Sequence, residues 1–125
     1  MKVGFIGLGN VGGKLSGSLI RNGVDIAVHD LDGALVAKSV EAGARAGGSA
    51  GELMRSCDAV ITCLPSPAAS DAVLQEMLPE VRAGKIWLEM STTDNAEVQR
   101  LAGLVEADRG DVIPGPMLAH KAEDD

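Results

Sequence analysis

A run of six residues near the start of the sequence has the spacing from which proteins build phosphate sites. It reads Gly7-Leu8-Gly9-Asn10-Val11-Gly12, with its three glycines at the G-x-G-x-x-G positions. In such a run the first glycine permits a tight turn, the second lets a pyrophosphate approach the backbone, and the third lets a helix pack closely on a strand. Amides at the start of that helix, and the positive end of its dipole, would hold the phosphates.

The flanking sequence supports this interpretation over a glycine turn that only forms a tight corner. Residues 2–6 read as a buried strand, residues 10–22 as a helix with Val11, Leu15 and Leu19 on one apolar stripe, and residues 24–29 as a second strand. Asp30 follows that strand, where a carboxylate can accept hydrogen bonds from the adenine ribose. The stretch from His29 through Leu31 to Asp32 holds two acids and no base, which disfavours the extra phosphate of NADP and predicts NAD.

The rest of the chain alternates strand and helix patterns. Further strands are predicted at residues 44–46, 59–64, 85–90 and 111–113, and helices at residues 31–41 and from Ser49, Ser66 and Asp94 onward. This alternation predicts an α/β fold: a Rossmann-type doubly wound parallel sheet in three αβα layers, as a single domain over residues 1–113. The pattern stops at Pro114, so residues 114–125 are expected to form an irregular or frayed tail.

Composition narrows the function classes. The chain has 125 residues, which suits one domain with one core. Because 46% of the residues are hydrophobic and only 2% are aromatic, that core must be mainly aliphatic, as in a buried parallel sheet. A net charge of −7 with scattered bases argues against nucleic-acid or anionic-membrane partners, and no apolar run is long enough to cross a bilayer. Cys57 and Cys63 match no metal or redox spacing, so we expect no metal site and two buried thiols in the cytoplasm.

Three segments together resemble the β-hydroxyacid dehydrogenases, the group of 3-hydroxyisobutyrate dehydrogenase and 6-phosphogluconate dehydrogenase. They are Gly4-Phe5-Ile6-Gly7-Leu8-Gly9-Asn10-Val11-Gly12, Cys63-Leu64-Pro65-Ser66 and Leu88-Glu89-Met90-Ser91-Thr92. The resemblance implies an NAD-binding domain in which Leu64 and Pro65 line the cofactor and Ser91 and Thr92 reach its nicotinamide half. In the complete enzyme, hydride would pass between NAD and a small 3-hydroxy acid. On the residues alone, Leu64-Pro65 could simply end a strand, and Ser91 or Thr92 could cap a helix.

The sequence departs from this family after its sixth predicted strand. The family's Pro-Val-Ser-Gly-Gly substrate loop is replaced by Pro116-Met117-Leu118-Ala119-His120, and Lys121 does not match the motif of the family's catalytic lysine. We therefore assign no catalytic residue, and we expect the helical substrate domain of the family to be absent. The alternatives are a stand-alone, non-catalytic NAD-binding module or a truncated remnant. The surface that would meet that domain is compatible with a homo-oligomer.

Overall fold

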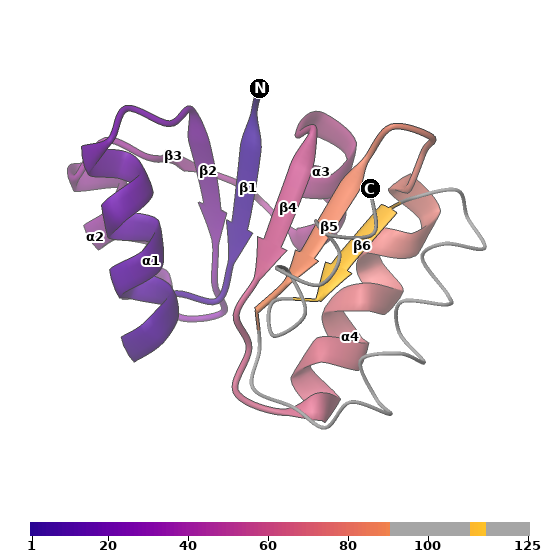
Figure 1. Ribbon diagram of the computed structural model, residues 1–125. Coiled ribbons are helices and arrows are strands. Elements are labelled where there is room, and N and C mark those ends of the chain that lie inside the picture. The colour runs from indigo at the N-terminus through magenta and orange to yellow at the C-terminus, as the bar shows by residue number, and fades with distance from the viewer. Residues whose placement is uncertain (91–110, 115–125) are drawn as a thin grey trace.

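The computed structural model describes residues 1–90 and 111–114 and shows a parallel sheet flanked by helices (Figure 1). The sheet has six strands in the order β3-β2-β1-β4-β5-β6, and each neighbouring pair is parallel. The strands are β1 (Val3–Ile6), β2 (Ile26–His29), β3 (Arg45–Ala46), β4 (Ala59–Thr62), β5 (Ile86–Glu89) and β6 (Asp111–Pro114). The helices are α1 (Asn10–Arg21), α2 (Gly33–Glu41), α3 (Ala50–Ser56) and α4 (Pro67–Met77), and α4 runs into a 3₁₀ turn, η1 (Leu78–Glu80).

The strand order places a switch point between β1 and β4. The chain builds outward from β1 to β3, returns across the sheet, and continues outward again from β4. Open α/β sheets bind ligands at such a point, outside the carboxyl ends of the strands. The predicted fold class, a Rossmann-type doubly wound sheet in three layers, is confirmed.

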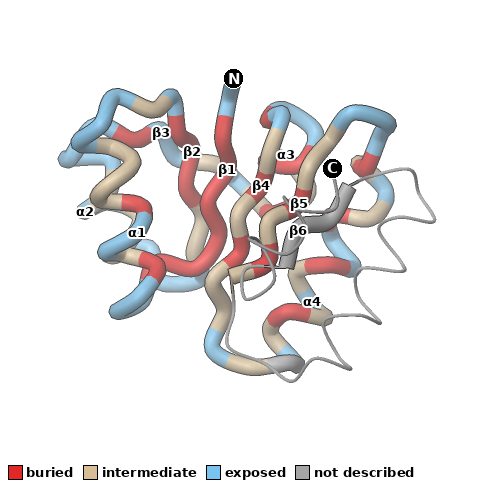
Figure 2. Tube along the Cα trace, in the orientation of Figure 1, coloured by how far each residue is buried: buried red, intermediate tan, exposed pale blue. Residues whose placement is uncertain are grey.

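Each face of the sheet has its own apolar cluster, and the buried residues follow the strands (Figure 2). On one face Ile6, Val60 and Trp87 pack with Leu53 and Met54 of α3 and with Leu74 and Met77 of α4. On the other face Phe5, Ile26 and Val28 pack against Leu19 and Ile20 of α1 and Leu35 and Val36 of α2. The alternating side chains of each strand therefore supply two cores, as expected for a sheet covered on both sides.

The predicted elements are present where the structure describes them, and their ends shift by a few residues. The predicted strand at residues 24–29 begins at Ile26, and the one at residues 59–64 ends at Thr62, because the chain turns toward the next helix there. The second helix begins at Gly33 because the Asp32 side chain accepts the N–H of Ala34 and caps it. The helix predicted from Asp94 and most of the tail lie outside the described residues.

The predicted apolar stripe of α1 faces the core only in part. Leu19 packs against the core, whereas Val11 and Leu15 are 63% and 37% exposed. The buried positions of α1 are Gly12 and Ser16. At Gly12 a small residue is required because the start of α1 lies against the backbone of the glycine turn, while Leu19 reaches the core farther along the helix.

Two glycines make this close packing feasible. Gly7 has a φ of +100°, and a Cβ on it would collide with the backbone carbonyl of Cys63. A Cβ on Gly12 would collide with the backbone carbonyl of Gly7. Backbone atoms cannot rotate aside as a long side chain can, so both positions require glycine.

We therefore predict that Gly12→Ala destabilises the fold although alanine is the better helix former. Helix propensity alone would stabilise it by about 1 kcal/mol, whereas overpacking against fixed backbone costs about 1–3 kcal/mol. Gly17→Ala, on the same helix, is the matched control, because its Cβ would meet only the end of the flexible Arg21 side chain, at 3.3 Å. Urea denaturation should show a lower midpoint for Gly12→Ala and an equal or higher one for Gly17→Ala. Equal midpoints for the two variants would contradict the close approach.

Candidate cofactor-binding site

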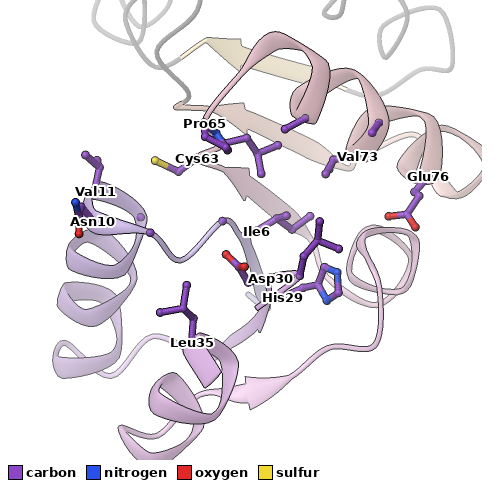
Figure 3. Close-up of a pocket in the computed structure, with 17 residues that line it drawn as sticks. Ile6, Asn10, Val11, His29, Asp30, Leu35, Cys63, Pro65, Val73 and Glu76 are labelled. Carbon is purple, nitrogen blue, oxygen red and sulfur yellow. The ribbon is translucent and has the colours of Figure 1, made fainter. Parts of the chain in front are cut away.

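A cleft of about 740 Å³ opens at the carboxyl ends of β1, β2 and β4, at the switch point of the sheet (Figure 3). The glycine turn and the start of α1 form one side of it, and one face of α4 forms another. Most of its lining is apolar. The lining residues are Ile6, Gly7, Gly9, Asn10, Val11, Gly12, His29, Asp30, Leu31, Leu35, Cys63, Leu64, Pro65, Ala69, Ala72, Val73 and Glu76.

The first turn of α1 differs from those of the other helices in having no side-chain cap. Asp32, Ser49 and Ser66 accept backbone N–H groups at the starts of α2, α3 and α4. Among the described residues, no side chain does this for α1, whose N-cap is Gly9, and no acid lies in its first turn. A helix start leaves backbone N–H groups without helical partners, and those of α1 lie at the cleft.

Space for a ligand exists at the middle glycine of the turn. A Cβ on Gly9 would have nothing within 4 Å, and the residue has an ordinary φ of −68°. Gly9 is therefore not required by the packing of the protein, in contrast to Gly7 and Gly12. Open backbone beside uncapped amides fits a pyrophosphate group, so the residues present suit a dinucleotide.

The Asp30 carboxylate joins the glycine turn to the end of β2. Its Oδ2 accepts the backbone N–H of Leu8 at 2.7 Å, and its Oδ1 accepts the N–H of Asp32 at 2.8 Å. The first bond fixes the turn, and the second shapes the loop that leads to α2. Each carboxylate oxygen can accept more than one hydrogen bond, so Asp30 keeps acceptor capacity toward the cleft.

A buried chain of hydrogen bonds fixes the ends of β4 and β5 beside the cleft. Trp87 Nε1 donates to Thr62 Oγ1 at 2.8 Å, and Thr62 Oγ1 donates to Glu89 Oε2 at 3.0 Å. Thr62 and Glu89 are register partners, and both are fully buried. Burial raises the pKa of the neighbouring Cys63 thiol, and the Glu89 carboxylate raises that pKa further. Cys63 therefore favours its neutral thiol form.

The sequence profile described as the NAD-binding domain of 6-phosphogluconate dehydrogenase matches residues 2–117. The chain belongs to this family. It is an NAD-binding domain of the β-hydroxyacid dehydrogenase type, so the family resemblance drawn from the three sequence segments is confirmed.

Individual relatives of this NAD-binding domain are longer than the chain itself. Human cytokine-like nuclear factor N-PAC is 31% identical over 123 residues, which are 96% of this chain and 22% of that protein. The protein named probable 3-hydroxyisobutyrate dehydrogenase, mitochondrial, from Dictyostelium discoideum is 30% identical over 118 residues, 92% of this chain and 37% of that one. The structure of Mycobacterium tuberculosis 3-hydroxyisobutyrate dehydrogenase with L-serine shares the fold, with a TM-score of 0.85, 23% identity and coverage of 90% and 39%.

The structure brings most of the predicted site residues of this NAD-binding domain together in one cleft. Gly7, Gly9, Asn10, Val11 and Gly12 line it, as do Asp30, Leu31, Leu64 and Pro65. Leu8 contributes its backbone N–H to Asp30, while its side chain is buried in the core. Ser91 and Thr92 lie outside the described residues, so their predicted place near the nicotinamide stays a prediction.

Sequence reasoning missed the wall of the cleft formed by α4. Ala69, Ala72, Val73 and Glu76 line it at helical spacing, on one face of the helix that follows Leu64-Pro65. The helical spacing is visible in the sequence, but it does not show that this face lines a cleft, because that depends on contacts between distant segments. The prediction of two buried thiols is also wrong for Cys63, which is only partly buried and lines the cleft, whereas Cys57 is buried.

We predict that bound NAD protects Cys63 from alkylation by iodoacetamide. Because the pKa of Cys63 is raised, little thiolate is present near pH 7, and the rate should climb as pH rises toward that pKa. Cys57, 1% exposed, is the internal control and should react only on unfolding. Peptide mass spectrometry over time would follow both thiols. A Cys63 rate unchanged by saturating NAD, in protein shown by titration to bind NAD, would place the cofactor elsewhere.

Proposed function

We propose that this chain binds NAD along the cleft, with the pyrophosphate on the backbone of the glycine turn and the start of α1. The carrying observation is the combination of open backbone at Gly9 and an uncapped first turn of α1. Asp30 would accept hydrogen bonds from the adenine ribose through its remaining acceptor capacity. Leu64 and Pro65 line the side of β4, and Ser91 and Thr92 would follow β5 on the way to the nicotinamide.

The charges around the cleft support a preference for NAD over NADP. Asp30 and Asp32 lie at the end of β2, and the described residues that line the cleft include no lysine or arginine. A phosphate on the ribose would face a carboxylate without a compensating lysine or arginine. Two like unit charges about 4 Å apart repel each other by about 1 kcal/mol in bulk water and by about 4 kcal/mol near a protein surface. NAD avoids this repulsion.

In the complete protein we propose hydride transfer between NAD and a small 3-hydroxy acid. When bound, the nicotinamide supplies the hydride acceptor, while proton removal and carboxylate binding require protein groups. The described residues bind and orient the cofactor, and we assign none of them a catalytic role.

We also propose a cytoplasmic location, because the free thiols of Cys57 and Cys63 suit a reducing compartment. Exposed Val11 and Leu15 are compatible with self-association.

A second candidate function is a non-catalytic NAD-binding module. Residues 116–120 depart from the substrate loop of the dehydrogenases, and N-PAC, at 31% identity, is named as a nuclear factor. Following NADH formation at 340 nm with 3-hydroxy acids and saturating NAD separates the candidates. Turnover by the whole protein supports the dehydrogenase, whereas NAD binding without turnover supports the module.

The substitution Gly9→Val tests the proposed phosphate site. A branched side chain there would occupy the space required by the pyrophosphate, so NAD affinity should fall by about two orders of magnitude, or about 2.7 kcal/mol. The fold should survive, because the position is open and its φ is ordinary. Gly33→Val at the start of α2 is the matched control, since a Cβ there also meets nothing within 4 Å and Gly33 does not line the cleft. Calorimetry showing equal NAD affinity in both folded variants would remove the turn as the phosphate site.

A substitution at Leu31, which is 99% exposed at the mouth of the cleft, tests the proposed preference for NAD. Leu31→Arg supplies the missing base without disturbing the core, and Asp30 keeps its two bonds to the backbone. NADP affinity should rise about tenfold while NAD affinity stays within about threefold. Val40→Arg, at an exposed position of α2 outside the cleft, adds the same charge and should change neither affinity. If Leu31→Arg leaves NADP binding unchanged, the ribose does not lie at the end of β2.

A further inference from the structure

Two polar side chains of the cleft have no part in the site described so far. Of the polar groups that line it, Asn10 lies at the start of α1, and Asp30 has both oxygens bonded to the backbone. Cys63 lies beside the glycine turn, where its Cβ is near Gly12. His29 and Glu76 remain, and both lie at the end of the cleft away from Asn10 and Val11 (Figure 3).

The fold places His29 and Glu76 on the same side of the sheet. His29 ends β2 and is the register partner of Ile6, whose side chain packs into the cluster under α3 and α4. Side chains that pair in register across parallel strands share a face, so His29 lies on the face that α4 covers. Glu76 lies on the face of α4 that lines the cleft, one turn beyond Ala72 and Val73.

Neither side chain has a hydrogen bond or an ion pair with another residue in the described part of the chain. His29 is partly exposed and Glu76 is exposed, so both can meet a ligand without the loss of an existing bond. Between them and the glycine turn the walls are apolar, with Ile6 on one side and Ala72 and Val73 on another. Such walls accept a flat aromatic ring, and the two polar groups lie where its edge would end.

Together the two groups offer one obligate acceptor and one donor. A carboxylate only accepts hydrogen bonds, and a histidine ring always carries at least one N–H. The edge of a 6-aminopurine presents an amino donor beside a ring-nitrogen acceptor. A 6-oxopurine presents a carbonyl acceptor beside a ring N–H donor, which reverses the pattern and sets the carbonyl oxygen against the carboxylate.

We propose that Glu76 and His29 recognise the 6-aminopurine edge of the cofactor, Glu76 by accepting the exocyclic amino group and His29 by donating to the adjacent ring nitrogen. The inference rests on the proposed cofactor site and adds base selection to it. The ring is then chosen by hydrogen bonds at its edge as well as by apolar contact with its faces. Without these two residues the cleft would accept either purine.

The test compares NAD with nicotinamide hypoxanthine dinucleotide, which differs from NAD only by an oxo group in place of the purine amino group. Calorimetric titration of the 125-residue chain should show NAD binding about tenfold tighter. In Glu76→Gln, whose amide can turn to donate or accept, the ratio should fall to within about threefold. His29→Leu should narrow the ratio through weaker NAD binding. Glu41→Gln, which removes the same charge at the end of α2, should keep the wild-type ratio.

The outcomes separate this inference from the proposed function. NAD that binds no more than about twofold tighter than the hypoxanthine analogue in the wild-type chain overturns the base recognition alone. A tenfold ratio that persists in Glu76→Gln also overturns it, since the discrimination would then come from another group. Failure of the wild-type chain to bind either dinucleotide overturns the proposed site and the inference together. Because Glu76 is exposed, the folding of its variant is not at risk.

Discussion

Between β1 and α1 the backbone passes so close to itself that no side chain fits in the gap. The carbonyl of Gly7 occupies the place of a Cβ on Gly12, and the carbonyl of Cys63 occupies the place of a Cβ on Gly7. This contact seats the start of α1 against the ends of β1 and β4. The uncapped amides of α1 consequently open onto the switch point of the sheet, where the cleft lies. With larger residues at either glycine, α1 would move outward and the cleft would lose the wall that we propose binds the pyrophosphate.

The Asp30 carboxylate is the second constraint, and it links two loops that the sequence separates. By accepting N–H groups from Leu8 and Asp32 it holds the glycine turn and the start of α2 in fixed positions. The residue that we propose to face the ribose hydroxyls thus also maintains the shape of the site. Replacement of Asp30 to change the cofactor would disturb the turn, whereas Leu31 points into solvent and can carry a new charge at little structural cost.

The sequence predicted the fold and the glycine turn that lines the cleft because both depend on local rules. Glycine spacing, helix caps at Asp32, Ser49 and Ser66, and the alternation of strands and helices are each readable within a few residues. The orientation of α1 could not be read the same way, since Val11 and Leu15 form an apolar stripe that the close backbone contact leaves exposed. The α4 wall and the second role of Asp30 depend on contacts between distant segments, which no local pattern encodes.

These constraints divide the work of recognition between backbone and side chains. In the proposed site, phosphate binding relies on backbone amides and on glycines that packing or ligand space requires, so it should tolerate few substitutions. The choice among cofactors would depend on side chains at the rim, such as Leu31 and Glu76, which are exposed. Such positions can change without a large cost in stability, because little of the core depends on them. A domain of this construction can therefore keep its fold and its phosphate site while the rim adapts to a different base, ribose substituent or partner.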